Sequence, residues 1–389
     1  MVPAARWAVV LVREELRKLG RPALLAGLLA LCLLLNGALL WGRSWLAPYA
    51  AEAAAVTRAV GPCMGASMEE ELRRRPASEA RQLLVDAVAD AQSTLASFDA
   101  DAYGAQQAAR IDHPAVAALM ASKYRAWSHR VREAAVAAED MDLYAGPATR
   151  EVRGLLNGTM LPLVIAEASL AGMAAVLYLF ELDGRTHAEA MVLASAAGQR
   201  SVWAKAAAAV LAALASYVVL TLVTLGACVV ALGLDGLAAS HVASQFNVIV
   251  EGMSARPVVM WSDFTVAGNV AATLAVGAVL VVAACLAAFG LVLLCGRRAL
   301  VAAGVLGIMA VAAPVLSQEL ALQGLWGAFS LVSLTPPCLL LTCYQWFTDM
   351  GMFALVPWHE TWGACVGAGL WAVSAWGVYR AFCKRSVAS

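Results

Sequence analysis

The stretch PALLAGLLALCLLLNGALLW occupies residues 22–41 and contains no charged residue. A helix of this length covers about 30 Å, which is the thickness of the hydrocarbon core of a bilayer. The rest of the chain agrees, because 62% of its 389 residues are apolar and 14% are charged, against about 45–50% and about 25% in soluble domains. The sequence therefore predicts an all-α integral membrane protein whose first span is residues 22–42.

Residues 1–21 come before this span and mix basic with apolar side chains. The basic ones are Arg6, Arg13, Arg17, Lys18 and Arg21. This pattern is typical of an amphipathic helix that lies on the membrane surface with its basic face toward water. A cleaved signal peptide is the alternative, but its apolar and basic regions would both be unusually long. We therefore expect an uncleaved first span.

Residues 43–156 are far richer in charge and predict a helical domain outside the membrane. Asp112 and Pro114 are suited to begin one of its helices. Two one-sided apolar stripes have helical spacing. They are Leu84, Val88, Ala91 and Leu95, and then Val116, Met120, Tyr124, Trp127 and Val131. We expect a hairpin that buries the two stripes against each other.

Residues 157–389 form the expected membrane domain, which brings the total to six spans. Its spans are predicted at 160–180, 206–232, 264–294, 299–316 and 360–379, followed by a tail at 380–389. Residues 317–358 are apolar but interrupted by prolines, and aromatic residues are scattered among them. That pattern favours broken, re-entrant or interfacial helices. Two extra short spans are the alternative.

Lys and Arg are unevenly divided between the short loops. The N-terminal segment, residues 181–205, the pair Arg297 and Arg298, and the C-terminal tail all lie on one side and hold most of the basic residues. By the positive-inside rule both termini and the 181–205 loop face the cytoplasm, and the 43–156 domain lies outside. Many Ala and few Lys residues suggest a bacterial source, so we expect a bacterial cytoplasmic membrane.

Several functional classes lack their motifs. No nucleotide-binding G-x-x-x-x-G-K-[ST] is present, none of the five His residues lies in a predicted span, and the Cys residues show no metal-ligand spacing. With zero net charge we expect no nucleic-acid partner. Few ionisable groups lie at membrane depth, which disfavours an ion-coupled transporter. We expect neither an enzyme nor a cofactor bound to this chain.

Residues 181–205 read ELDGRTHAEAMVLASAAGQRSVWAK. Thr186 and Glu189 have the spacing of a capping box, and Gly198 is a suitable helix end. The stretch therefore predicts a short helix of about 11 residues, about 16 Å long, between the second and third spans. Such a helix is suited to receive force from a partner; a solvated connector is the alternative.

The whole arrangement resembles a permease of the ABC-2 type, an exporter class whose ATPase is commonly a separate chain. A surface helix, a first span, a large outer domain, the 181–205 loop and four further spans follow one another in that order. Six loop residues match the family pattern: Glu181, Gly184, Thr186, Leu193, Arg200 and Lys205. Two positions depart from it, because Arg185 separates the Gly and the Thr, and Ala197 replaces a frequent Pro.

The resemblance implies that the loop, with Arg185 and Glu189 included, and the N-terminal helix dock on the ATPase. That partner would bind ATP and Mg²⁺. It also implies that a second permease copy, or a paralogous permease, completes the path within the membrane lipids. The apolar spans favour lipid-like, peptide or drug-like cargo. A membrane-anchored sensor or scaffold, whose outer domain binds a ligand or partner, is the alternative function.

Glu167 is an ionisable residue inside a predicted span, about 20 Å from its cytoplasmic end. Such groups usually face a protein interior or a water-filled cavity. The resemblance places the second and fifth spans beside the translocation path. We therefore expect Glu167 to face the fifth span or the partner permease near the exit, and a purely structural carboxyl is the alternative.

Overall fold

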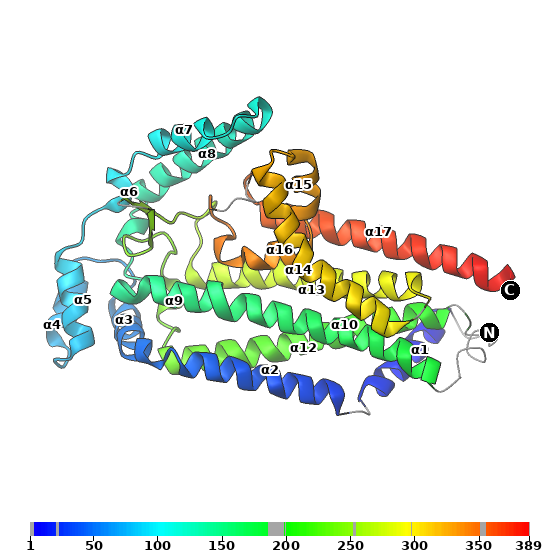
Figure 1. Ribbon diagram of the computed structural model, residues 1–389. Helices are drawn as coiled ribbons and strands as arrows, with labels where there is room; N and C mark the ends of the chain where they lie inside the picture. Colours follow the sequence, from blue (N-terminus) through cyan, green and yellow to red (C-terminus); the bar gives the residue numbers. More distant parts are fainter. Residues whose placement is uncertain are drawn as a thin grey trace.

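The computed structural model describes residues 4–20, 23–185, 198, 200–251, 254–296, 298–350 and 355–388. It is 79% helical and has the form of an elongated bundle of long helices (Figure 1). Both chain ends lie at one end of the bundle, and helices α3 to α8 lie at the other (Figure 1). We call these the terminal end and the insert end.

Five helices are long and apolar enough to cross a membrane, among the residues that the structure describes. They contain α2, α10, α12, α13 and α14, with bounds Leu24–Trp41, Leu161–Arg185, Arg200–Leu232, Val266–Leu294 and Ala299–Leu322. The sixth predicted span belongs to α17, His359–Ala388, which is long enough but less apolar. Its many Gly and Trp residues lower its mean hydropathy. The fold is therefore all-α and compatible with a multi-pass membrane protein, and the sixth crossing stays a prediction.

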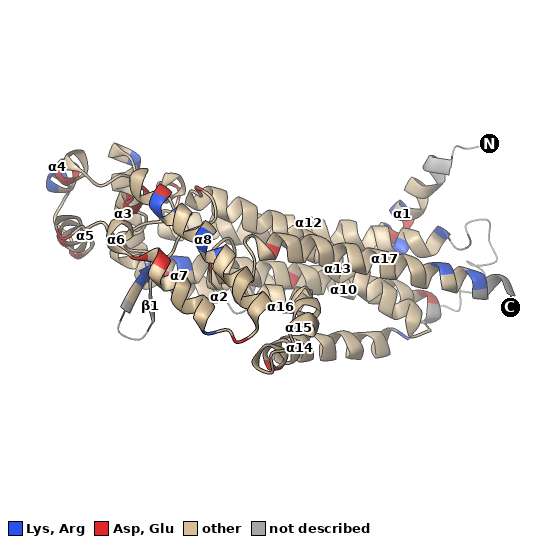
Figure 2. Ribbon diagram, turned by 90° about the horizontal axis from the view of Figure 1, so that it is seen from above, with Lys and Arg blue, Asp and Glu red and all other residues tan. Residues whose placement is uncertain are grey.

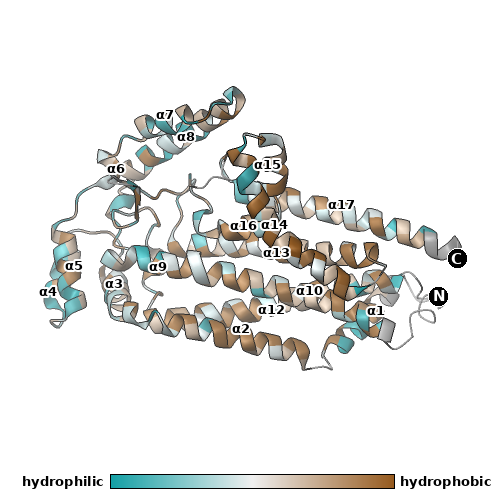
Figure 3. Ribbon diagram, in the orientation of Figure 1, coloured by the Kyte–Doolittle hydropathy of each residue, from teal (hydrophilic) through white to brown (hydrophobic). Residues whose placement is uncertain are grey.

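Charged residues gather at the two ends of the bundle, and its middle is nearly free of them (Figure 2). The same middle section is predominantly hydrophobic (Figure 3). Burial explains part of this pattern: most of the apolar segment of α13 is buried, whereas α2 and α14 expose most of theirs. Leu300 on α14 is 85% exposed. The exposed apolar helices are the surfaces that lipid would cover.

Close helix contacts hold the centre together. α13 runs between α10, α12 and α17. A Cβ atom added to Gly172 on α10 would lie 2.4 Å from the Cys285 sulfur and 2.7 Å from Ala213 Cβ, so a side chain there would force the three helices apart. On α17, a Cβ on Gly367 would lie 2.6 Å from the Leu334 carbonyl oxygen. The Gly363-x-x-x-Gly367 spacing therefore allows close packing.

The insert consists of short helices around two separate cores. They are α3, Ala47–Val60; α4, Ala66–Arg74; α5, Glu79–Ala89; α6, Thr94–Ser97; α7, Ala100–Ala109; and α8, Pro114–Val136. Leu84 and Val88 on α5 pack into the main core, whereas Leu95 packs with Trp127 and Val131 of α8 in a second core. The predicted hairpin is therefore wrong: α5 ends at Ala89, before the stripe does, and α8 pairs with α7 instead.

Two further segments join the insert to the bundle. α9, Thr149–Leu155, continues through a π-helical turn, Leu156–Met160, into α10. Residues 233–263, which connect two predicted spans, contain the strands β1, Val248–Glu251, and β2, Ser254–Pro257. The strands are antiparallel, with Ile249 opposite Arg256.

The interrupted region after the fifth span consists of short helices. α14 extends to Leu322, beyond the predicted end at 316, and α15, Trp326–Ser333, and α16, Pro336–Leu341, pack back against it. A 3-10 turn, Cys343–Gln345, follows. Pro336 begins α16 at a position where its missing N–H costs nothing. Whether these helices enter a membrane stays a prediction.

At the terminal end, α1 spans Ala4–Gly20 and packs against α12 and α10. Residues 181–185, which we expected to start the loop, continue α10, and residues 200–205 begin α12. Both α10 and α12 extend into the predicted loop because neither segment contains a Pro or two adjacent Gly residues that would end the helix. The predicted loop helix lies outside the described residues.

Candidate functional site

An ion pair joins α10 and α12 at the base of the 181–205 stretch. Lys205 is 3% exposed, and its Nζ lies 2.5 Å from Oδ2 of Asp183. The same ammonium donates a hydrogen bond to the Leu179 carbonyl at 2.7 Å and lies 5.2 Å from the centre of the Phe180 ring. A buried ammonium requires partners of this kind. The contacts therefore fix the two helices to each other where the loop leaves the bundle.

The surface helix α1 takes part in the same cluster. Lys18 Nζ lies 2.8 Å from Oε1 of Glu15 and 3.4 Å from Oδ1 of Asp183. Burial opposes the charge of Lys18, but the hydrogen bonds and charges of Glu15 and Asp183 outweigh it and raise the pKa of the ammonium. Glu15 itself is 6% exposed. The half-buried Lys18 and the buried Lys205, Glu15 and Asp183 thus tie α1, α10 and α12 together, and we call these four residues the loop-base cluster.

Aromatic packing makes the beginning of α12 rigid. The centre of the Trp203 ring lies 5.1 Å from that of Phe289 on α13, and 5.9 and 5.3 Å from those of Trp376 and Tyr379 on α17. Stacked and edge-on rings at these distances add to the stability gained by burial. A cavity of about 500 Å³ lies beside Trp203 between α1, α12 and α17, and Arg200 contributes to its wall. A displacement of α12 would therefore also move α13 and α17, which contact Trp203.

The structure places only some of the predicted loop residues. Glu181 is half-buried near the end of α10, and Gly184 and Arg185 are the last residues of that helix. Arg200 is exposed at the start of α12. Thr186, Glu189 and Leu193 lie outside the described residues, so the capping box stays a prediction. Lys205 is buried against Asp183, so it belongs to the base of the loop and not to an exposed docking face.

Two residues of the loop-base cluster, Asp183 and Glu15, were not singled out from the sequence. Asp183 was assigned to a loop, where a carboxylate is unremarkable. Had α10 been continued past Phe180, Asp183 would have fallen on the same helix face as Leu179, four residues earlier. A carboxylate on a buried face requires a cation, and Lys205 is one of only four lysines in the chain.

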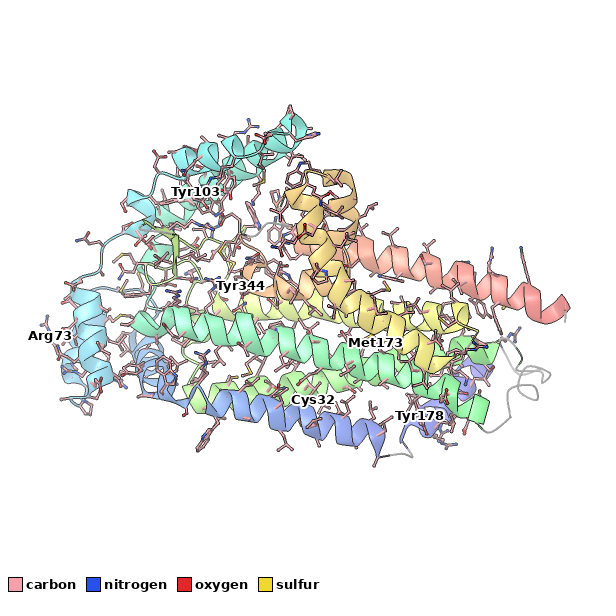
Figure 4. All side chains as sticks on the ribbon, viewed as in Figure 1. Cys32, Arg73, Tyr103, Met173, Tyr178 and Tyr344 are labelled. Atoms are coloured by element: carbon pink, nitrogen blue, oxygen red, sulfur yellow. The ribbon has the colours of Figure 1, made fainter. Side chains whose placement is uncertain are left out.

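Glu167 is buried between the first three spans. Its Oε2 accepts a hydrogen bond of 3.0 Å from Asn36 Nδ2 on α2, and Asn36 also donates to Thr224 Oγ1 on α12 at 2.9 Å. Figure 4 labels Cys32, one helical turn before Asn36 on α2. The expectation that Glu167 faces the fifth span is therefore wrong within this chain. Ala166, Ser169, Leu170 and Met173 of α10 line a cavity beside α14, and Glu167 is not among its lining residues.

The cavity beside α14 has a volume of about 300 Å³ and lies between α10, α13, α14 and α16. Met173, labelled in Figure 4, is one of its lining residues. Its walls are apolar apart from the hydroxyls of Ser169 and Thr335. A cavity of this size and lining is suited to an apolar group with one or two hydrogen-bonding atoms.

Within the described part of the chain, no group of three or more His, Cys, Asp or Glu side chains is placed to hold a metal ion. Comparison with protein-family models, with curated proteins and with solved structures gave no match.

Proposed function

We propose that this chain is the membrane-spanning permease subunit of an ATP-binding-cassette exporter of the ABC-2 type, acting with a separate ATPase. The observation that carries the proposal is the loop-base cluster. Lys18 of α1 and Lys205 of α12 share the carboxylate of Asp183 on α10. These ion pairs connect the surface helix to the helices on both sides of the loop, and such a connection would let a force from an ATPase on α1 or the loop reach the bundle.

The packing around the loop-base cluster would transmit its movement to the rest of the bundle. Trp203 lies on α12 two residues before Lys205 and contacts α13 and α17. A push on α1 or on the loop would therefore shift α12 against the central helices as a body, because packed interfaces move between discrete arrangements rather than deforming smoothly. In this proposal ATP and Mg²⁺ bind to the partner chain, and a second permease copy or a paralogue completes the path.

The cavity between α10 and α14 favours a cargo with an apolar body. It lies between α10, α13, α14 and α16, and none of its described lining residues is charged. We propose that lipid-like, peptide or drug-like molecules are the cargo class. We also propose that the chain is oriented in a bacterial cytoplasmic membrane with both termini in the cytoplasm and the insert outside.

The experiment reverses single charges at the terminal end. Arg200→Glu and Glu181→Arg are expected to weaken co-purification with the proposed ATPase partner, and to abolish stimulation of its ATP hydrolysis. Arg298→Glu is the matched control, because Arg298 is also exposed at this end but precedes α14. All three variants are expected to insert normally. If the ATPase co-purifies and turns over normally with both test variants, the loop is only a connector and the proposal fails.

A further inference from the structure

A third cavity, of about 390 Å³, lies at the insert end where α9 leads into α10. Three arginines line it: Arg150 and Arg153 from α9, and Arg256 from β2. Tyr344, labelled in Figure 4, borders it from the 3-10 turn after α16. Among the described residues of its wall there is no carboxylate. We call it the arginine cavity.

Arg153 is the most informative of the three arginines. It is 9% exposed, and its guanidinium donates to the Asn247 side-chain oxygen at 3.1 Å and to the Tyr344 carbonyl at 3.2 Å. Both acceptors are neutral. Arg153 therefore has no anionic partner among the described residues. A buried charge without a counter-charge costs several kcal/mol, and an anion bound here would reduce that cost.

The two other arginines differ in how their charge is balanced. Arg256 donates to both oxygens of Asp349, at 3.0 and 2.9 Å, so that carboxylate neutralises it. Arg150 is exposed and forms no ion pair among the described residues. The cavity thus has one neutralised arginine and two arginines whose charge no described carboxylate balances.

The floor of the cavity is left open by two glycines. A Cβ atom added to Gly154 would meet nothing within 4 Å, and one added to Gly158 would meet only Tyr344 Cβ at 3.9 Å. Both line the cavity. Gly158 lies within the π-helical turn Leu156–Met160, which begins two residues after Gly154, and such turns occur frequently at functional sites. Larger side chains would fit here sterically, so packing of the protein alone does not explain the open space.

We propose that the arginine cavity binds the phosphate group of an anionic ligand. Guanidinium groups present planar pairs of donors that match phosphate oxygens, and Arg153 is held in place by Asn247 and Tyr344. Val248, Val250 and Met350 supply an apolar wall beside the arginines, which suits a phosphate ester that carries hydrocarbon. The site does not depend on the export function, because it lies on the insert side and shares no residue with the loop-base cluster.

The test uses the purified full-length chain in a neutral detergent, with two probes. One is inorganic phosphate, and the other is short-chain phosphatidylglycerol. Gly154→Leu fills the open floor and also removes a helical glycine, so it is expected to fold at least as stably as the parent. Arg153→Gln removes the unbalanced charge. Each is expected to weaken probe binding by at least about tenfold, which corresponds to 1.4 kcal/mol.

Two matched controls accompany these variants. Arg110→Gln removes an exposed arginine of the insert, and Gly226→Leu enlarges an exposed glycine of α12 that also has open space around it. Both are expected to bind the probes as the parent does. Binding of both probes supports a site for free phosphate, and binding of the lipid alone supports a lipid headgroup. The proposal is overturned if neither probe binds the parent, or if Gly154→Leu binds as well as the parent.

Discussion

The two ends of the bundle bury charge in different ways. At the terminal end, Lys18 and Lys205 face Glu15 and Asp183, so cations and carboxylates are equal in number. At the insert end, Arg130 and Glu139 form a buried pair. Around the arginine cavity, by contrast, the buried cations Lys123, Arg153 and Arg256 meet a single described carboxylate, Asp349. Lys123, on α8, donates to the Asp349 carbonyl oxygen and is 1% exposed.

This difference separates two uses of buried charge. A group with equal numbers of cations and carboxylates holds helices in a fixed relation. It needs no external ion, since each charge has its partner within the protein. A cationic excess raises the free energy of the empty protein and is relieved when an anion arrives. The loop-base cluster is therefore suited to hold helices together, and the arginine cavity is suited to the anion that we propose it binds.

The comparison first requires that the two ends lie on opposite sides of a membrane. Single-Cys proteins that retain Cys63 in the insert or Cys383 in α17 test this with an impermeant thiol reagent on intact cells. Cys63 is expected to be labelled nearly completely and Cys383 only at background. Burial and Asp142 raise the pKa of the Cys63 thiol, so labelling should be performed at mildly alkaline pH. The reverse pattern would end the proposed orientation.

The balanced end should be very sensitive to loss of one partner. Asp183→Leu removes the carboxylate that is hydrogen-bonded to the buried Lys205, and breaking a buried pair in this way costs about 3–5 kcal/mol. We expect a marked fall in melting temperature and in folded yield in detergent. The double variant Asp183→Leu with Lys205→Met removes both charges, and we expect it to recover much of the loss. If the double variant is as unstable as the single one, the ion pair is not what joins the helices.

Lys123 at the insert end should make stability depend on pH. Burial, with Arg256 adding to it and Asp349 opposing it, lowers the pKa of Lys123 from 10.5 to about 8. Between these two values the unfolded chain binds more protons than the folded one, so stability rises with pH there, by about 3 kcal/mol in all. Below about pH 8 Lys123 contributes no slope. The measurement is the difference in melting temperature between the parent and Lys123→Met, taken at several pH values between 8 and 10.5. A difference that does not change with pH would contradict the prediction.

The contact between the ends, in the middle of the bundle, should give the smallest effect. Glu167→Leu leaves Asn36 with Thr224 alone and is expected to cost about 1 kcal/mol, a typical value for a hydrogen bond between membrane helices. Glu167→Gln keeps a polar partner and should cost less. Thermal melts of both variants in detergent measure this. Equal stability of all three proteins would show that the Asn36 contact contributes nothing.

The sequence predicted the helical class well, because long apolar runs such as 22–41 leave the backbone no other way to satisfy its hydrogen bonds in lipid. It predicted the ends of helices poorly. The α10 helix continues through Asp183, since a few polar residues do not stop a helix that tertiary contacts support. The Leu84–Leu95 stripe shows the opposite error, because its helical spacing continues across a break at Asp90.

The candidate sites depend on contacts that are distant in the sequence, and this is why the sequence did not reveal them. Glu167 was recognisable as unusual, but Asn36 lies 131 residues away from it. Asp349 and Arg256 are 93 residues apart, and β2 was not expected at all. Their pairing follows from how the connector and the residues after α16 fold together, which no local pattern records.

The π-helical turn between α9 and α10 has a consequence for the phase of the whole second span. One extra residue in a helical turn rotates everything beyond it by about 100° about the helix axis. Thr159 Oγ1 donates to the Gly154 carbonyl, five residues earlier, which satisfies an acceptor in this turn. The angular positions of Arg150 and Arg153 are thereby set independently of those of Glu167 and Asp183. A lineage that deletes one residue here would keep both segments intact and yet point them at the wrong neighbours.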